Sequence, residues 1–300
     1  MFSIRNTLAI DMMTAMPSGS ITRRIKDISS ITKRIYAETT TPTVTALLDK
    51  VENEAAKNPD GWGEWDKANL SEMRRIHSHL SALPPELYIA SVQVSNEGRK
   101  IHAQAMKENN WKAAEPYIQK VVDLYKKIAE LKQKKFNTAS PYRALLMGYA
   151  SDISDRQMDD LYDGLLQPLK GIYGQALEKQ KAQSAPIPLD GDFTKADQMW
   201  LNKTVLEMMG FDFERGGLYA SNLSPMTGGN PDDVRVLVRC GDSANFLDSL
   251  SDTLYQGARG IYYQNLPEAW HSQPVGQDQG AIMMNACLLY TSPSPRDGLL

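Results

Sequence analysis

The chain has 300 residues, a formal net charge of -3 and 42% apolar residues. This composition supports a globular core and excludes disordered and collagen-like chains, and no apolar run reaches the ~18 residues that a membrane span needs. The near-neutral charge gives no electrostatic reason to expect nucleic acid or an anionic membrane as a partner. Cys240 and Cys287 cannot form a secreted disulfide framework, and the first residues do not read as a signal peptide, so we expect a cytoplasmic protein.

Apolar residues at helical spacing predict a mostly α-helical chain. An isoleucine stripe recurs at three- and four-residue steps from Ile21 to Ile35, and Ser20 is placed to cap that helix. Similar patterns predict helices at 43–57, 66–82, 85–108, 111–135, 154–183, 194–209 and 244–263. Between residues 216 and 240, the short runs Gly217–Ala220 and Val234–Arg239 predict a small β-hairpin or meander beside the helices.

The last segment departs from this pattern. From Cys287 the chain reads CLLYTSPSPRD, which resembles the translated read-through of a sequencing adapter. The alternative is a genuine Pro-rich tail. We therefore take residues 1–286 as the native domain and 287–300 as an artefact tail that carries no functional inference.

The sequence contains none of the common nucleotide-binding, serine-hydrolase or paired-cysteine motifs. His77 and His79 are two residues apart on a predicted helix, so they point in nearly opposite directions and cannot hold one ion from one face. We expect both on a solvated helix surface, and we expect His102 to be an ordinary surface or packing residue.

Several blocks stand in a fixed order along the chain: DMMTAMPSG at 11–19, GFDFERG at 210–216, SPMTGGNPDDVR at 224–235, YYQNLP at 262–267 and QPVG at 273–276. Together they resemble the carboxypeptidase Taq family of zinc metallocarboxypeptidases over residues 10–286. The resemblance implies a mostly α, elongated, zincin-like domain with a small β-sheet beside a cleft, whose C-terminal part is missing here. It also implies a homodimer that uses zinc to remove C-terminal residues from peptides.

The resemblance also assigns positions to the zinc site. Such enzymes carry HExxH, in which two histidines bind zinc and the glutamate activates water. Counting back from YYQNLP places this motif on Tyr255, Gln256 and Arg259, and counting on from QPVG places the third ligand pair on Met284 and Asn285. None of these side chains replaces an ordinary zinc ligand or the general base, so we predict no zinc cofactor.

Two other family elements are partly retained. The HPF element falls on Ser224, Pro225 and Met226 and loses its histidine, whereas DxRxT keeps Asp233 and Arg235 but loses its threonine. Scaffold positions survive while the reactive positions differ, which predicts a catalytically inactive pseudopeptidase. Two alternatives stay open: an active carboxypeptidase with an unconventional site, and a helical interaction scaffold for an active paralogue.

Three arginines suggest what an inactive copy would bind. We expect Arg235, Arg239 and Arg259 to project toward the former peptide cleft, where they could hold the free C-terminal carboxylate of a peptide without cleaving it. The alternative assigns these arginines to structural ion pairs. The acids considered as their partners are Asp232, Asp233 and Asp242.

Overall fold

The computed structural model describes residues 1–149, 153–184, 191–221, 224–241, 245–278, 280 and 284–285. The artefact tail predicted at 287–300 lies outside these residues. The helices are α1 (Phe2–Asp11), α2 (Ile21–Thr39), α3 (Pro42–Lys57), α4 (Glu64–Ser81), α5 (Pro85–Lys107), α6 (Trp111–Phe136), α7 (Pro141–Leu146), α8 (Asp155–Lys181), α9 (Lys195–Met209) and α10 (Phe246–Gln264). The strands are β1 (Gly216–Ser221), β2 (Met226–Asn230) and β3 (Asp233–Arg239).

The predicted helices are all present, with ends that differ by a few residues. Side-chain caps explain several of the starts, because the oxygen of Thr41, Ser154 or Thr194 accepts a backbone N–H of the first turn. Ser20 precedes α2 as predicted, but its side chain makes no capping hydrogen bond. The short helices α1 and α7 were not predicted. A mostly helical fold with a small sheet is therefore confirmed.

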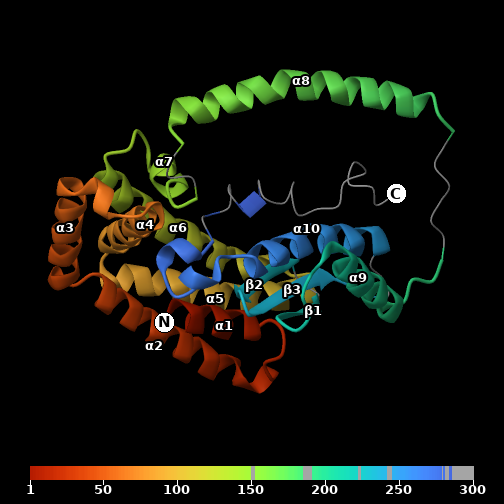
Figure 1. The fold of residues 1–300 in the computed structure, drawn as a ribbon. Coiled ribbons are helices and arrows are strands. Elements are labelled where there is room, and N and C mark those ends of the chain that lie inside the picture. The colour runs from red at the N-terminus through yellow and green to blue at the C-terminus, as the bar shows by residue number, and fades with distance from the viewer. Residues whose placement is uncertain are drawn as a thin grey trace.

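The N-terminal helices form the larger layer of the molecule (Figure 1). Helix α5 packs against both α2 and α6. The isoleucine stripe of α2 faces this layer, where Ile28 and Ile35 are buried. The Tyr36 hydroxyl donates to the carbonyl oxygen of Leu83 at 2.7 Å, which ties α2 to the loop before α5.

Helix α8 stands apart from the rest of the described chain (Figure 1). None of its residues is buried. Its large apolar side chains recur at helical spacing and are exposed: Leu161, Tyr162, Leu165, Leu166, Leu169, Ile172 and Tyr173. A wide apolar face without a partner is unusual for a soluble helix.

The three strands form one sheet in the order β1-β3-β2. The hairpin predicted from the runs 217–220 and 234–239 is wrong, because those runs lie in β1 and β3, which pair parallel. The antiparallel partner of β3 is β2, which was not predicted. The alternative of a meander is wrong, because β1 pairs parallel to β3 rather than to β2. Gly216 permits this pairing, since a Cβ there would overlap the carbonyl oxygen of Val234.

The sheet lies between α1 and the pair α9 and α10. Val234, Val236 and Val238 point to one face and are buried with Leu206 and Ile261. On the other face, Ile10 of α1 lies against Gly228. The alternation of β3 therefore sends its valines toward α10 and Arg235 toward α1. In the part of the chain that the structure describes, no helix is long and apolar enough to cross a membrane.

Candidate functional site

The rotation of α10 is set by two buried glycines. A Cβ at Gly257 would overlap the side chain of Leu206, and a Cβ at Gly260 would lie 2.8 Å from the ring of Phe211. The helix can therefore approach α9 and β3 closely, and its glycine face is fixed against them. Tyr255 and Arg259, one turn apart, lie on a more open side, where Tyr255 is 45% exposed.

This side of α10 meets residues 284–285. The Tyr255 hydroxyl donates to Oδ1 of Asn285 at 3.0 Å, and Nε of Arg259 lies 3.4 Å from Sδ of Met284. The guanidinium carbon of Arg259 lies 5.9 Å from the centre of the Tyr255 ring, within cation–π range. The structure thus brings together the two segments on which the sequence resemblance places the zinc ligands.

Gln256 points to a different neighbour. It is 4% exposed, and the Thr227 hydroxyl on β2 lies 2.7 Å from its carbonyl oxygen and 3.0 Å from its Oε1. The residue at the predicted general-base position is therefore a buried amide that helps to hold α10 against the sheet. Thr227 was missed from the sequence, because a hydroxyl within a short polar run carries no signal of its own.

The groups at this site do not fit a zinc ion. Tyr255, Arg259, Met284 and Asn285 offer a phenol, a guanidinium, a thioether and an amide, whereas protein zinc sites use thiolate, imidazole and carboxylate. Arg259 adds a permanent positive charge where a cation would have to bind. Among the described residues, no group of three or more His, Cys, Asp or Glu side chains is placed to hold a metal.

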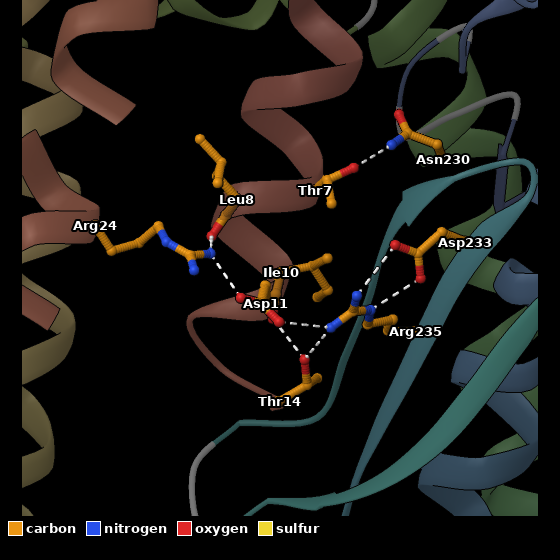
Figure 2. Close-up of polar contacts among 9 residues, drawn as sticks. All are labelled: Thr7, Leu8, Ile10, Asp11, Thr14, Arg24, Asn230, Asp233 and Arg235. Carbon is orange, nitrogen blue, oxygen red and sulfur yellow. Dashed lines mark hydrogen bonds and ion pairs between the residues drawn. The ribbon is translucent and has the colours of Figure 1, made fainter. Parts of the chain in front are cut away.

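Arg235 does not join this site. Its guanidinium lies on the α1 face of the sheet, where it contacts both carboxylate oxygens of Asp233 at 2.9 and 3.1 Å (Figure 2). It also donates to Asp11 at 2.9 Å and to Thr14 at 2.8 Å. The sequence-based expectation that Arg235 points toward the region of Arg259 is corrected, because the pleat of β3 separates them.

Asp11 is the centre of this network. Its carboxylate accepts a second charged bond from Arg24 at 2.6 Å, and Arg24 also donates to the carbonyl oxygen of Leu8 (Figure 2). Burial alone would raise the pKa of Asp11, but the hydrogen bonds and charges of Arg24 and Arg235 outweigh it and hold that pKa below its ordinary value. The retained Asp11, Thr14, Asp233 and Arg235 thus form one structural cluster between α1 and β3.

Arg239 is also engaged by an acid. Its Nε and Nη2 donate to the two oxygens of Asp252 on α10 at 2.8 and 3.0 Å. The alternative of structural ion pairs therefore applies to Arg235 and Arg239, although Asp252 was not among the acids considered. Asp232 pairs instead with Arg215 at 3.0 Å, and Asp242 lies outside the described residues. Ser224 is exposed in the segment before β2.

Two histidines depart from expectation. His77 is only 7% exposed and lies 3.0 Å from the Thr45 hydroxyl, so its placement on a solvated surface was wrong. His79 lies 3.3 Å from Nζ of Lys132 and packs on the ring of Phe136. Burial, with the charges of Lys132 and Arg75, lowers the pKa of His79 to about 4. Both histidines thus connect neighbouring helices, α4 to α3 and α4 to α6. His102 is exposed, as expected.

Comparison with known proteins gives the family context. A family model described as carboxypeptidase Taq (M32) metallopeptidase matches residues 1–283. Thermostable carboxypeptidase 1 of Thermus thermophilus is 25% identical over 276 residues, which are 89% of this chain and 53% of that protein. Carboxypeptidase 1 of Bacillus subtilis is 22% identical over 264 residues, which are 86% of this chain and 50% of that protein. The chain thus spans about half the length of the curated relatives it matches.

Solved structures agree on the fold. Trypanosoma cruzi metallocarboxypeptidase 1 superposes with a TM-score of 0.79 at 22% identity, covering 97% of this chain and 57% of that one. The M32 carboxypeptidase of Deinococcus radiodurans R1 gives a TM-score of 0.75 at 19% identity, covering 97% and 56%. At these identities the likeness establishes the fold alone.

Proposed function

Since the chain belongs to the carboxypeptidase Taq (M32) metallopeptidase family, we propose that it is a non-catalytic member, a pseudopeptidase that binds no zinc and hydrolyses no peptide bond. The curated relatives are named carboxypeptidases, which makes peptides the class of molecule to consider. Because the chain covers about half of each of them, our statement about the activity of the whole protein is itself a proposal.

One observation carries the proposal. The side chains at the positions that the sequence resemblance assigns to zinc ligands contact one another, and they are a cation, a phenol and an amide, not imidazoles and a carboxylate. Zinc binding is favourable when the ligands are deprotonated or carry a free lone pair. The guanidinium of Arg259 stays protonated and has no lone pair to give. Gln256 adds to this argument, because a neutral amide cannot accept the proton that a general base removes from water.

Metal content and turnover test this proposal together. We expect the purified protein to contain no stoichiometric zinc by plasma mass spectrometry after incubation with zinc and gel filtration. We also expect no release of C-terminal amino acids from blocked dipeptides, with the Bacillus subtilis carboxypeptidase 1 as the positive control. One zinc per chain together with zinc-dependent turnover would overturn the proposal in favour of an active enzyme with an unconventional site.

A second candidate function is favoured by α8. An interaction scaffold needs a surface for its partner, and the apolar side chains of α8 provide one that the described chain does not cover. In this reading the partner is an active paralogue. The discriminating measurement is binding of that purified paralogue to the wild type and to Leu165→Asp, with Gln167→Asp, on the polar side of α8, as the matched control. Equal binding by both variants removes this candidate.

A further inference from the structure

Arg259 differs from the other arginines at the sheet and α10 because it forms no ion pair with the described residues, whereas Arg235 and Arg239 do. Arg235 and Arg239 each contact both oxygens of an aspartate. Arg259 forms no ion pair with any acid of the described chain, and its neighbours Tyr255, Met284 and Asn285 are neutral. A half-buried guanidinium without a counter-ion favours an anionic ligand.

Asp278 is the described acid to consider as a counter-ion for Arg259. It is close enough to Tyr263, one turn after Arg259, that the Tyr263 hydroxyl donates to its Oδ2 at 2.7 Å. Its Oδ1 accepts the backbone N–H of Gly280 at 3.2 Å. Both oxygens of Asp278 are thus engaged by other donors, and neither forms an ion pair with Arg259.

The neighbours of Arg259 leave a particular set of donors available. Its Nε is turned toward Met284, a weak thioether acceptor, so the two Nη groups at the end of the guanidinium have no partner among the described residues. The bond from Tyr255 to Oδ1 of Asn285 fixes that amide. Its Nδ2, which can only donate, is then directed away from the phenol oxygen.

We propose that Arg259, together with the Asn285 amide, binds a carboxylate where the family's active members are expected to hold zinc. The carboxylate would accept paired hydrogen bonds from the Nη groups, the bidentate geometry that guanidinium and carboxylate favour. Tyr255 is a positioning residue, since its hydroxyl orients Asn285. The ligand class, a peptide with a free C-terminal carboxylate, follows from the proposed function and from the names of the curated relatives, which are carboxypeptidases. This inference rests on the proposed non-catalytic function.

Isothermal titration with three probes tests the assignment. The first is an N-acetylated tripeptide with a free C-terminal carboxylate, the second is the same tripeptide as its C-terminal amide, and the third is acetate. We expect the free-acid peptide to bind at least about tenfold more tightly than the amide, which is the loss of one charge-assisted contact. Binding of acetate as tight as that of the free-acid peptide would overturn the peptide assignment and leave a simple anion site.

Variants locate the contact. Arg259→Gln should reduce the affinity for the free-acid peptide to that of the amide, and Asn285→Ala should give a smaller loss in the same direction. Arg23→Gln is the matched control, because Arg23 is exposed on α2 and pairs with Asp27 on the same helix. Thermal unfolding of each variant confirms that it is folded. Unchanged affinity in a folded Arg259→Gln protein overturns the proposal, as does a wild type that binds neither peptide.

A chelator separates this result from failure of the proposed function. We expect excess EDTA to leave the affinity of the free-acid peptide unchanged, because the positive charge belongs to Arg259. If EDTA abolishes binding, or if zinc analysis finds metal and the peptide is cleaved, the non-catalytic function itself is wrong. If no metal and no cleavage are found but the acid and amide bind equally, only the Arg259 site is wrong.

Discussion

The hydroxyl of Tyr255 and the amide oxygen of Asn285 are hydrogen-bonded at 3.0 Å, although the two residues are 30 positions apart in the chain. This bond joins α10 to residues 284–285, the two segments on which the sequence resemblance places the zinc ligands. In an active site a metal ion would supply such a connection. Here neutral side chains and the neighbouring Arg259 provide it.

The first prediction concerns the thermal stability of the protein in the presence of a chelator. Because the bond between Tyr255 and Asn285 needs no metal, we expect the melting temperature to be the same with and without excess EDTA. The Bacillus subtilis relative serves for comparison in the same differential scanning calorimetry experiment. A clear fall in the melting temperature of this chain on adding EDTA would contradict the prediction.

The second prediction restores the ligand set. The combined change Tyr255→His, Gln256→Glu, Arg259→His and Asn285→Glu places two imidazoles and a carboxylate where the segments already meet. We expect this variant to retain about one zinc per chain after gel filtration, since the geometry is retained and the donors now suit zinc. The control omits Asn285→Glu and should retain less zinc. Equal and negligible zinc in both would show that the segments are not in register for a metal.

The third prediction concerns the cluster around Asp11. The change Asp11→Asn leaves Arg235 and Arg24 without their shared carboxylate, and we expect it to lower the free energy of unfolding by about 2 kcal/mol in urea titrations. Asp27→Asn removes an exposed pair with Arg23 and should cost less than about 0.5 kcal/mol.

The same cluster should give a pH dependence. The folded pKa of Asp11 is lowered, so its contribution is present above the unfolded pKa near 4 and is lost as the pH falls through the folded value. We therefore expect the difference between wild type and Asp11→Asn to shrink below about pH 4. A difference that stays constant down to pH 2 would show that the carboxylate charge is not the source of the stability.

The fourth prediction concerns His79. Its pKa falls from 6.5 to about 4 on folding, so the unfolded chain binds the extra proton and stability should decrease as the pH falls from about 6.5 toward 4. Allowing for solvent screening of this partly exposed ring, we expect about 1–2 kcal/mol over that range. His79→Gln should remove this component of the pH slope, whereas His102→Gln, at an exposed position, should keep it.

The fifth prediction compares two glycines. Gly216→Ala would drive a Cβ into the carbonyl oxygen of Val234, and we expect a loss of more than about 2 kcal/mol because the parallel pairing of β1 and β3 must shift. Gly164→Ala in α8 meets nothing within 4 Å and should be neutral or stabilise by up to about 1 kcal/mol through helix propensity. Similar effects of the two changes on urea unfolding would be inconsistent with this packing.

Much of the helical fold could be predicted because its cause is local. The isoleucine stripe of α2 and the caps at Ser154 and Thr194 are properties of neighbouring residues, and the structure has the expected helices there. The parallel β1–β3 pairing was not predictable in this way. It depends on how distant parts of the chain place β1 beside β3, whereas the adjacent runs of sequence favoured a simple hairpin or meander.

The site was predictable in part for the same reason. Family spacing located the positions 255, 256, 259 and 284–285, and the structure brings 255, 259 and 284–285 together. Family spacing could not reveal that Gln256 faces Thr227, because this contact depends on how the glycines of α10 fix the rotation of that helix. The ion pairs of Arg235 and Arg239 likewise depend on Asp11 and Asp252, which only the folded chain brings into contact.

The bond between Arg235 and Asp11 also orders events during synthesis, since it spans 224 positions of the chain. A ribosome needs roughly 10–40 s to make that many residues. During that interval α1 has emerged, yet its partners on β2 and β3 do not exist, and of the two arginines that bind Asp11 only Arg24 has been made. Helix α1 is therefore among the last elements described here to reach its final place.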